Sequence, residues 1–191
     1  MFNLGKMSVK FKLLLPVLIL VILCLSIMGV LNYQAARNLL TTQMEEQILK
    51  IAVAQSENID NWLKIRLAEV ETLANTGIVR SMDLTQIEPG LVKHHERLQE
   101  YYELLYVAEP NGICHLSTGG ENNIADRDYF QQVMAGKTLV SDPVISKATG
   151  NPTVVAIAPI KNDSGQVIGA FGGVVLIDTL NRMVLDVKVG Q

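Results

Sequence analysis

Nineteen consecutive residues without a charge, residues 13–31 (LLLPVLILVILCLSIMGVL), constrain the fold of this 191-residue chain more than any other feature. As a helix that rises about 1.5 Å per residue, the segment would be about 28 Å long, close to the ~30 Å thickness of a bilayer's hydrocarbon core. The chain is 49% hydrophobic but only 18% charged, so it carries more apolar residues than a soluble domain needs. We therefore predict a transmembrane helix over residues 13–31.

The charges on either side of this segment predict its orientation. Lys6, Lys10 and Lys12 precede it without any acidic residue, whereas the thirteen later basic residues are outnumbered by all nineteen acidic residues. Because lysine-rich flanks are retained in the cytoplasm, we expect residues 1–12 to be cytoplasmic and the rest of this single-pass cell-membrane protein to be extracytoplasmic. A cleaved signal peptide has a similar pattern, but its apolar core is usually only about 7 to 15 residues long. The acidic external part has no basic stripe, which argues against nucleic acid as a partner.

A long helix is predicted after the membrane segment. Neither Gly nor Pro occurs between Val30 and Thr76, and apolar residues recur there at three- and four-residue steps. The pattern predicts an external helix over residues 32–77 with Gly77 as its C-terminal cap.

This external helix would be about 65 Å long, which is more than the width of a small domain. Half of it must therefore cross a second module or pair with another chain, and the apolar stripe favours a parallel homodimer along residues 33–76. The stripe breaks at Gln55 and Ser56, where we expect its partner surface to change.

The remaining chain predicts a small α+β module. A turn at Glu88-Pro89-Gly90 and a short helix come first, a helix between Asp126 as N-cap and Gly136 follows later, and a last helix starts at Asp178. Because their connections are too short for helical crossovers, the strands should form a five-stranded antiparallel sheet. The segments with strand character are residues 103–109, 113–117, 138–146, 153–160 and 166–177.

Motifs for catalysis are scarce in this sequence. A nucleophile elbow, a P-loop and an H-E-x-x-H zinc motif are all absent. Adjacent His94 and His95 would point to different sides of a helix and make a poor metal pair. Cys114 reads as a small apolar residue of a strand. We therefore expect no catalytic residue, no metal and no cofactor.

The most distinctive cluster is the run DRDYF, residues 126–130, at the start of a predicted helix. Arg127 could hold a carboxylate through two parallel hydrogen bonds, an anion is favoured at a helix start, and Tyr129 and Phe130 could wall a small pocket. The flanking aspartates could instead accept an ammonium group. The same residues could equally be an exposed first turn with two aromatic side chains in the core.

A second candidate position is Ser141-Asp142-Pro143, which interrupts a predicted strand. Because proline cannot donate to a strand ladder, this segment should be a sheet edge or a bulge. Bulges near binding sites redirect side chains, so Asp142 joins Arg127, Tyr129 and Phe130 as a candidate ligand contact. A purely structural bend explains the same residues equally well.

In this order, these segments resemble a known family. DRDYFQQVMAGK, the S-D-P strand, the turn ATGNP and the strand GQVIGAFGG resemble the membrane-distal module of double Cache (dCache) sensor domains. Such domains occur in methyl-accepting chemotaxis proteins, sensor histidine kinases and diguanylate cyclases. The resemblance covers roughly residues 13–186 and implies a PAS-like Cache module over residues 78–186, with the long helix packed along its sheet.

The resemblance also implies a ligand site between the sheet and the loops. Arg127 matches an arginine that binds the ligand's carboxylate in amino-acid-binding members, and Tyr129 and Phe130 stand for two aromatic residues. Asn122 stands where those members have a tyrosine, and Val174 or a neighbour stands where they have an aspartate for the ammonium. The implied ligand is therefore a small carboxylate or an amino-acid-like molecule.

The sequence analysis leads to an extracytoplasmic sensing module of a chemoreceptor-like membrane receptor. Residues 187–191 would be a truncated link to a second module and an output domain. Two alternatives are a membrane-anchored dimerisation stalk without a ligand and, less favoured, an anchored enzyme.

Overall fold

The computed structural model describes residues 9–185, so the predicted cytoplasmic segment 1–12 lies mostly, and the predicted link 187–191 wholly, outside the described residues. Helix α1 (Val9–Ala74) is a single continuous helix of 66 residues, as the absence of Gly and Pro after Val30 predicted. Among residues 9–185, it is the one helix long and apolar enough to cross a bilayer.

The chain divides into two compact units, Met1–Ala54 and Gln55–Gln191. The side chains of residues 13–54 are all exposed, whereas buried positions begin beyond that point in α1, with Arg66, Val70 and Ala74. The division therefore falls at the break in the apolar stripe that Gln55 and Ser56 marked in the sequence.

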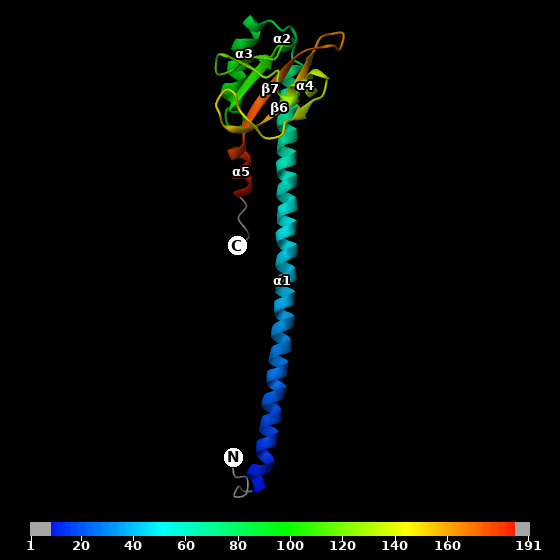
Figure 1. Ribbon diagram of the computed structural model, residues 1–191, viewed down its shortest axis with the longest axis vertical. Helices are drawn as coiled ribbons and strands as arrows, with labels where there is room; N and C mark the ends of the chain where they lie inside the picture. Colours follow the sequence, from blue (N-terminus) through cyan, green and yellow to red (C-terminus); the bar gives the residue numbers. More distant parts are fainter. Residues whose placement is uncertain (1–8, 186–191) are drawn as a thin grey trace. The chain divides into compact units, whose positions relative to one another are not determined.

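The second unit contains the last part of α1, four short helices and an antiparallel sheet (Figure 1). Seven strands are present among residues 9–185, in the order β3-β2-β1-β7-β6-β4, and β5 also pairs with β6. The helices are α2 (Gly77–Arg80), α3 (Leu84–Leu98), α4 (Asp128–Met134) and α5 (Ile177–Leu185). The strands are β1 (Leu104–Ala108), β2 (Ile113–Leu116), β3 (Glu121–Asn123), β4 (Leu139–Val140), β5 (Val144–Ile145), β6 (Pro152–Lys161) and β7 (Val167–Leu176). The predicted α+β fold is confirmed.

The strand count differs from the five that were expected for two reasons. Strand β3 is a polar three-residue segment without any alternation of apolar residues, so the sequence carried no signal for it. The predicted strand 138–146 is split into β4 and β5, which both pair with β6 and form the edge of the sheet. Between them, the Ser141 hydroxyl accepts a hydrogen bond from the Val155 amide at 2.9 Å in place of a strand partner. The edge interruption predicted from Pro143 is thus confirmed.

Three helix boundaries differ from the prediction. Gly77 is not the C-terminal cap of α1, because Thr76 donates a side-chain hydrogen bond to the Leu73 carbonyl at 2.8 Å and Gly77 then opens α2. Pro89 lies inside α3 instead of forming a turn, because the Asp83 carboxylate already caps the helix by accepting from the Thr85 amide at 3.1 Å. The N-cap position of α4 is Arg127 rather than Asp126.

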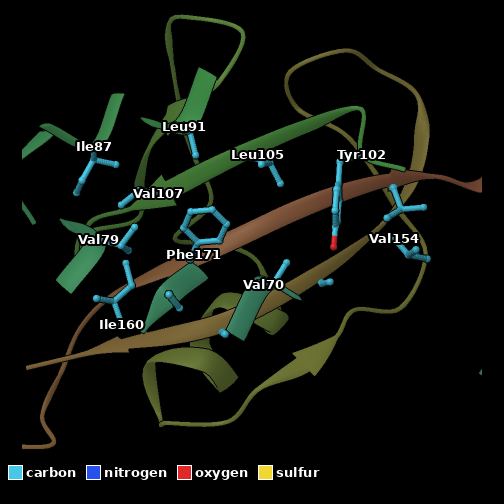
Figure 2. Close-up of a cluster of buried hydrophobic side chains, with 14 residues drawn as sticks. Val70, Val79, Ile87, Leu91, Tyr102, Leu105, Val107, Val154, Ile160 and Phe171 are labelled. Atoms are coloured by element: carbon cyan, nitrogen blue, oxygen red, sulfur yellow. The ribbon is translucent and has the colours of Figure 1, made fainter. Parts of the chain in front are cut away.

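The sheet is buried on both faces, which explains why its strands are apolar at successive positions. One face packs against α1, α2 and α3 in the cluster shown in Figure 2, where Phe171 of β7 lies among Val70, Ile87 and Leu91. The other face packs against α4 through a second cluster that includes Phe130 and Val133.

Two adjacent glycines of β7 leave room for tyrosine rings on opposite faces of the sheet. The ring of Tyr106 lies over Gly172 on the face of α4, and the ring of Tyr102 lies over Gly173 on the face of α1. A Cβ atom built at Gly173 would be 2.5 Å from Tyr102 Cε1, closer than real side-chain contacts allow. The Tyr102 hydroxyl donates to the Arg66 carbonyl oxygen of α1 at 2.9 Å, so this ring joins the sheet to the helix.

Replacing Gly173 with alanine should therefore destabilise the protein by about 1–3 kcal/mol, because the added methyl group displaces the Tyr102 ring. Gly90 offers a matched control, since a Cβ there meets no atom within 4 Å and the residue lies inside α3. Gly90→Ala should stabilise the protein by about 0.5–1 kcal/mol. Chemical unfolding of the full chain in detergent measures both, and equal effects of the two substitutions would contradict this packing.

Candidate functional site

A cavity opens on the face of the sheet that carries α4, opposite the face that packs on α1. It encloses about 400 Å³, its open mouth included. The sheet forms its floor, and the segments before α4 and after β5 border it. Its lining residues are Leu104, Tyr106, Cys114, Leu116, Asn122, Ile124, Arg127, Tyr129, Val144, Ile145, Ser146, Lys147, Ala148, Thr153, Val155 and Val174.

Arg127, which the sequence analysis predicted as a ligand contact, contributes a charged side chain to the cavity. It precedes α4 in an extended conformation, with φ −86° and ψ 130°, and it lines the cavity. One terminal nitrogen, Nη2, donates to the Ile145 carbonyl oxygen at 2.8 Å, which ties the start of α4 to β5. Its Nε atom is buried and has no hydrogen-bond partner. The bond from Nη2 thus holds the guanidinium group in place at the cavity.

Two tyrosines line the same cavity. Tyr129 of α4 is 7% exposed and Tyr106 of β1 is 3% exposed. Burial raises the pKa of Tyr129 to about 12 and raises the pKa of Tyr106 well above its ordinary value, so both remain protonated at neutral pH. The Tyr106 hydroxyl is buried, and the neighbouring Tyr129 side chain adds to the rise in its pKa that burial causes.

The loop after β5 is anchored across the mouth of the cavity by Lys147. Its Nζ atom donates to the Asn123 carbonyl oxygen at 2.9 Å and to the Asp126 carboxylate at 2.6 Å. The hydrogen bond from Lys147 holds the pKa of Asp126 below its ordinary value. Asp126 therefore anchors a loop in this structure, and does not cap α4 as the sequence predicted.

The lining of the cavity is cationic. Arg127 and Lys147 line it, and none of its lining residues is Asp or Glu. The Cys114 thiol is also uncharged, because burial raises its pKa to about 12. The floor carries the apolar side chains of Leu104, Val155 and Val174.

The other two predicted ligand contacts lie beside this cavity and not in its lining. Phe130 is 4% exposed and packs in the core between α4 and the sheet. Asp142 is exposed and borders a neighbouring groove, which Arg127 and Tyr129 also line. The structure thus brings Arg127, Tyr129 and Asp142 around one groove and leaves Phe130 as a supporting side chain.

The sequence analysis did not identify Tyr106 or Lys147 as site residues. Tyr106 lies in a strand that is buried on both faces. The only feature that distinguished it in the sequence was its hydroxyl group, for which the sequence predicted no partner. Lys147 belongs to the turn KATG, whose composition predicts only a turn. Both residues line the cavity because of tertiary contacts, which a local sequence pattern does not predict.

Other clusters within residues 9–185 do not suggest a reaction centre. No group of three or more His, Cys, Asp or Glu side chains in this part of the chain is arranged to hold a metal ion. His115 is buried, and its Nε2 atom lies 2.9 Å from a Glu109 carboxylate oxygen. The cavity around Arg127 is therefore the best-defined candidate site.

Comparison with known families identifies the class of protein. The Cache domain family (dCache_1) matches residues 32–191, which is most of the chain. The chain therefore belongs to the Cache domain family, as the sequence resemblance predicted.

Two chemotaxis proteins are similar over nearly the whole chain. The methyl-accepting chemotaxis protein PscA of Pseudomonas syringae pv. tomato is 23% identical over 91% of this chain and 28% of its own length. The methyl-accepting chemotaxis protein PctB of Pseudomonas aeruginosa is 24% identical over 96% of this chain and 30% of its own length. This chain thus spans less than a third of the length of these relatives.

Solved structures of chemoreceptor domains share the fold. The ligand-binding domain of the Pseudomonas fluorescens chemoreceptor CtaA, solved with L-alanine, superposes with a TM-score of 0.64 at 18% identity over 73% of this chain and 63% of that domain. The sensory domain of the Campylobacter jejuni chemoreceptor Tlp3 (CcmL), solved with isoleucine, gives a TM-score of 0.58 at 18% identity over 71% of this chain and 60% of that domain.

Proposed function

We propose that this chain is the extracytoplasmic sensing part of a chemoreceptor-like membrane receptor. In this proposal, a small organic ligand with a carboxylate group binds in the cavity beside Arg127. The observation that carries the proposal is a cavity on the Cache domain sheet that is lined by Arg127, whose guanidinium group is fixed to the Ile145 carbonyl oxygen. Family membership and the similarity to chemotaxis proteins support a sensor over an enzyme.

The proposed mechanism is a shift between two packings of the module. The mouth of the cavity is held by Arg127, which bonds the Ile145 carbonyl oxygen, and by Lys147, which bonds Asp126. A ligand that bonds Arg127 from inside the cavity would draw these segments toward the sheet. The opposite face of the same sheet holds α1 through the Tyr102 hydroxyl. Ligand binding then favours one packing of α1 over the other.

The first test is ligand binding by the full chain in detergent, measured by thermal unfolding against a panel of organic acids and amino acids. A ligand at 100 times its dissociation constant should add about 2.7 kcal/mol of stability. Arg127→Ala should weaken the binding of each hit by about tenfold or more, because it removes a charge-assisted hydrogen bond.

Arg80→Ala is the matched control for this test. Arg80 bonds the Lys161 carbonyl oxygen and pairs with Asp163, and it does not line the cavity. This variant should bind the hits as tightly as the parent chain. If Arg127→Ala also binds them as tightly, the assignment of the site is wrong. A panel without any stabilising compound favours a stalk, and consumption of a hit during incubation favours an anchored enzyme.

We also propose that the N-terminus is cytoplasmic and that the sheet lies outside the cell membrane, because lysines cluster before the apolar segment and acidic residues follow it. A variant with Ser164→Cys, in the exposed turn between β6 and β7, should react with a membrane-impermeant maleimide in intact cells. A variant with Asn3→Cys should react only after permeabilisation. Both are made in the Cys24→Ser, Cys114→Ser background. The reverse labelling pattern would contradict this topology.

We propose that the exposed apolar side chains on the external part of α1 form the interface of a parallel homodimer. Met44 and Ile48 are 62% and 65% exposed and lie four residues apart on one helix face. Met44→Cys should form an intermolecular disulfide in membranes under mild oxidation, in the same background without native cysteines. Glu46→Cys, on a different face of the helix, is the control. Equal cross-linking of the two variants would contradict a defined interface.

A further inference from the structure

We propose that a second cavity, on the face of the sheet that packs against α1, binds a small, uncharged, apolar molecule. The cavity lies among α1, α2, α3 and β7 and encloses about 420 Å³, its open mouth included. It shares no lining residue with the cavity beside Arg127. The inference is therefore independent of the proposed function.

The inner wall of this second cavity consists of buried apolar side chains. Each of them is between 2% and 8% exposed, and each belongs to the core cluster on the face of α1. They come from three elements and gather on one side of the sheet in Figure 2: Val79 of α2, Ile87 and Leu91 of α3, and Phe171 of β7. A ligand would thus meet an apolar surface that the fold has already formed.

The space itself is left open by a glycine on the inward face of α3. Ile87, Gly90 and Leu91 line the cavity at the three- and four-residue spacing of one helix face. A Cβ atom at Gly90 would meet no atom within 4 Å. After proline, glycine is the least favourable residue inside a helix, and a space among apolar side chains forfeits their packing contacts. The chain therefore leaves open a volume that a larger residue at this position could fill.

The polar groups of the lining favour an uncharged ligand. Among the described residues, none that lines this cavity is Asp, Glu, Lys or Arg. The Thr76 hydroxyl already donates to the Leu73 carbonyl oxygen at 2.8 Å, and His94 is exposed to solvent. A charged ligand would lose its hydration without a carboxylate, ammonium or guanidinium group to replace it. An apolar ligand would instead gain by removing its surface from water.

The position of the cavity gives its ligand direct access to α1. Leu73, in the last turn of α1, lines the cavity, and Ile78 of α2 lines it while remaining 55% exposed. A ligand that enters past Ile78 would therefore contact α1 itself. A ligand beside Arg127 would lie on the other face of the sheet.

The test is equilibrium dialysis of the full chain in lipid nanodiscs with two uncharged ring compounds, indole and benzyl alcohol. Benzoate and benzylamine are the charged compounds of similar size. Because the uncharged compounds also dissolve in lipid, nanodiscs that hold a Gly90→Leu variant serve as the reference. We expect the parent chain to take up additional indole or benzyl alcohol in a saturable manner, and to bind benzoate and benzylamine at least about tenfold more weakly.

Gly90→Leu should abolish this uptake, because the leucine side chain enters the cavity. It should not lower the melting temperature, since the side chain meets open space and leucine favours a helix more than glycine does. Val92→Leu is the matched control on the same helix: Val92 is 43% exposed and does not line the cavity, so this variant should bind indole as the parent chain does. Arg127→Ala should also bind indole as tightly as the parent chain.

A second readout leaves Gly90 and the buried wall intact. Ile78→Cys, in the Cys24→Ser, Cys114→Ser background, places a thiol at the exposed edge of the lining. Saturating indole should slow the alkylation of this thiol by iodoacetamide severalfold. Ser164→Cys in the same background, in the exposed turn between β6 and β7, should react at an unchanged rate.

The outcomes separate this inference from the proposed function. Equal uptake by the parent chain and Gly90→Leu overturns it, and equal binding of benzyl alcohol and benzoate does so too. If Gly90→Leu does not fold, alkylation of Ile78→Cys at the same rate with and without indole overturns it instead. Loss of indole binding in Arg127→Ala would place the ring compounds in the other cavity, which contradicts this inference and leaves the proposed function standing.

Discussion

The fold depends on the two-sided burial of strand β7. This strand lies between β1 and β6, and its successive residues point alternately into two different cores. Phe171 and Val175 pack toward α1, whereas Ala170 and Val174 pack toward α4 and the cavity. Because ten residues of one strand serve both clusters, neither core can be formed without the other.

The two faces of the sheet therefore differ in their chemistry. The face of α1 is held by apolar packing and by Arg66, whose guanidinium carbon lies 4.2 Å from the centre of the Tyr101 ring and which pairs with Glu69 at 3.1 Å. The opposite face keeps a cavity that Arg127 and Lys147 line. The candidate site and the attachment of α1 therefore lie on opposite faces of one sheet.

Much of this organisation could be predicted from the sequence. Hydrophobic periodicity and composition were sufficient to predict α1, the strands β1 and β2, and the long strands β6 and β7. They were not sufficient for β3, which is short and polar, or for Pro89, whose helix depends on a cap six residues earlier. Arg127 and Tyr129 could be predicted from a local run of residues, but Tyr106 could not. Its role depends on the cross-strand register with Gly172, which is a property of the assembled sheet.

The glycine pair of β7 has a mechanical consequence. Tyr102 and Tyr106 lie four residues apart on the same chain segment, and their rings rest on the adjacent residues Gly173 and Gly172 from opposite sides. Tyr106 lines the candidate cavity, and the Tyr102 hydroxyl donates to the backbone of α1. A small change in the separation or shear of β1 and β7 therefore displaces both hydroxyl groups together. The spacing between β1 and β7 therefore affects the cavity through Tyr106 and the position of α1 through Tyr102.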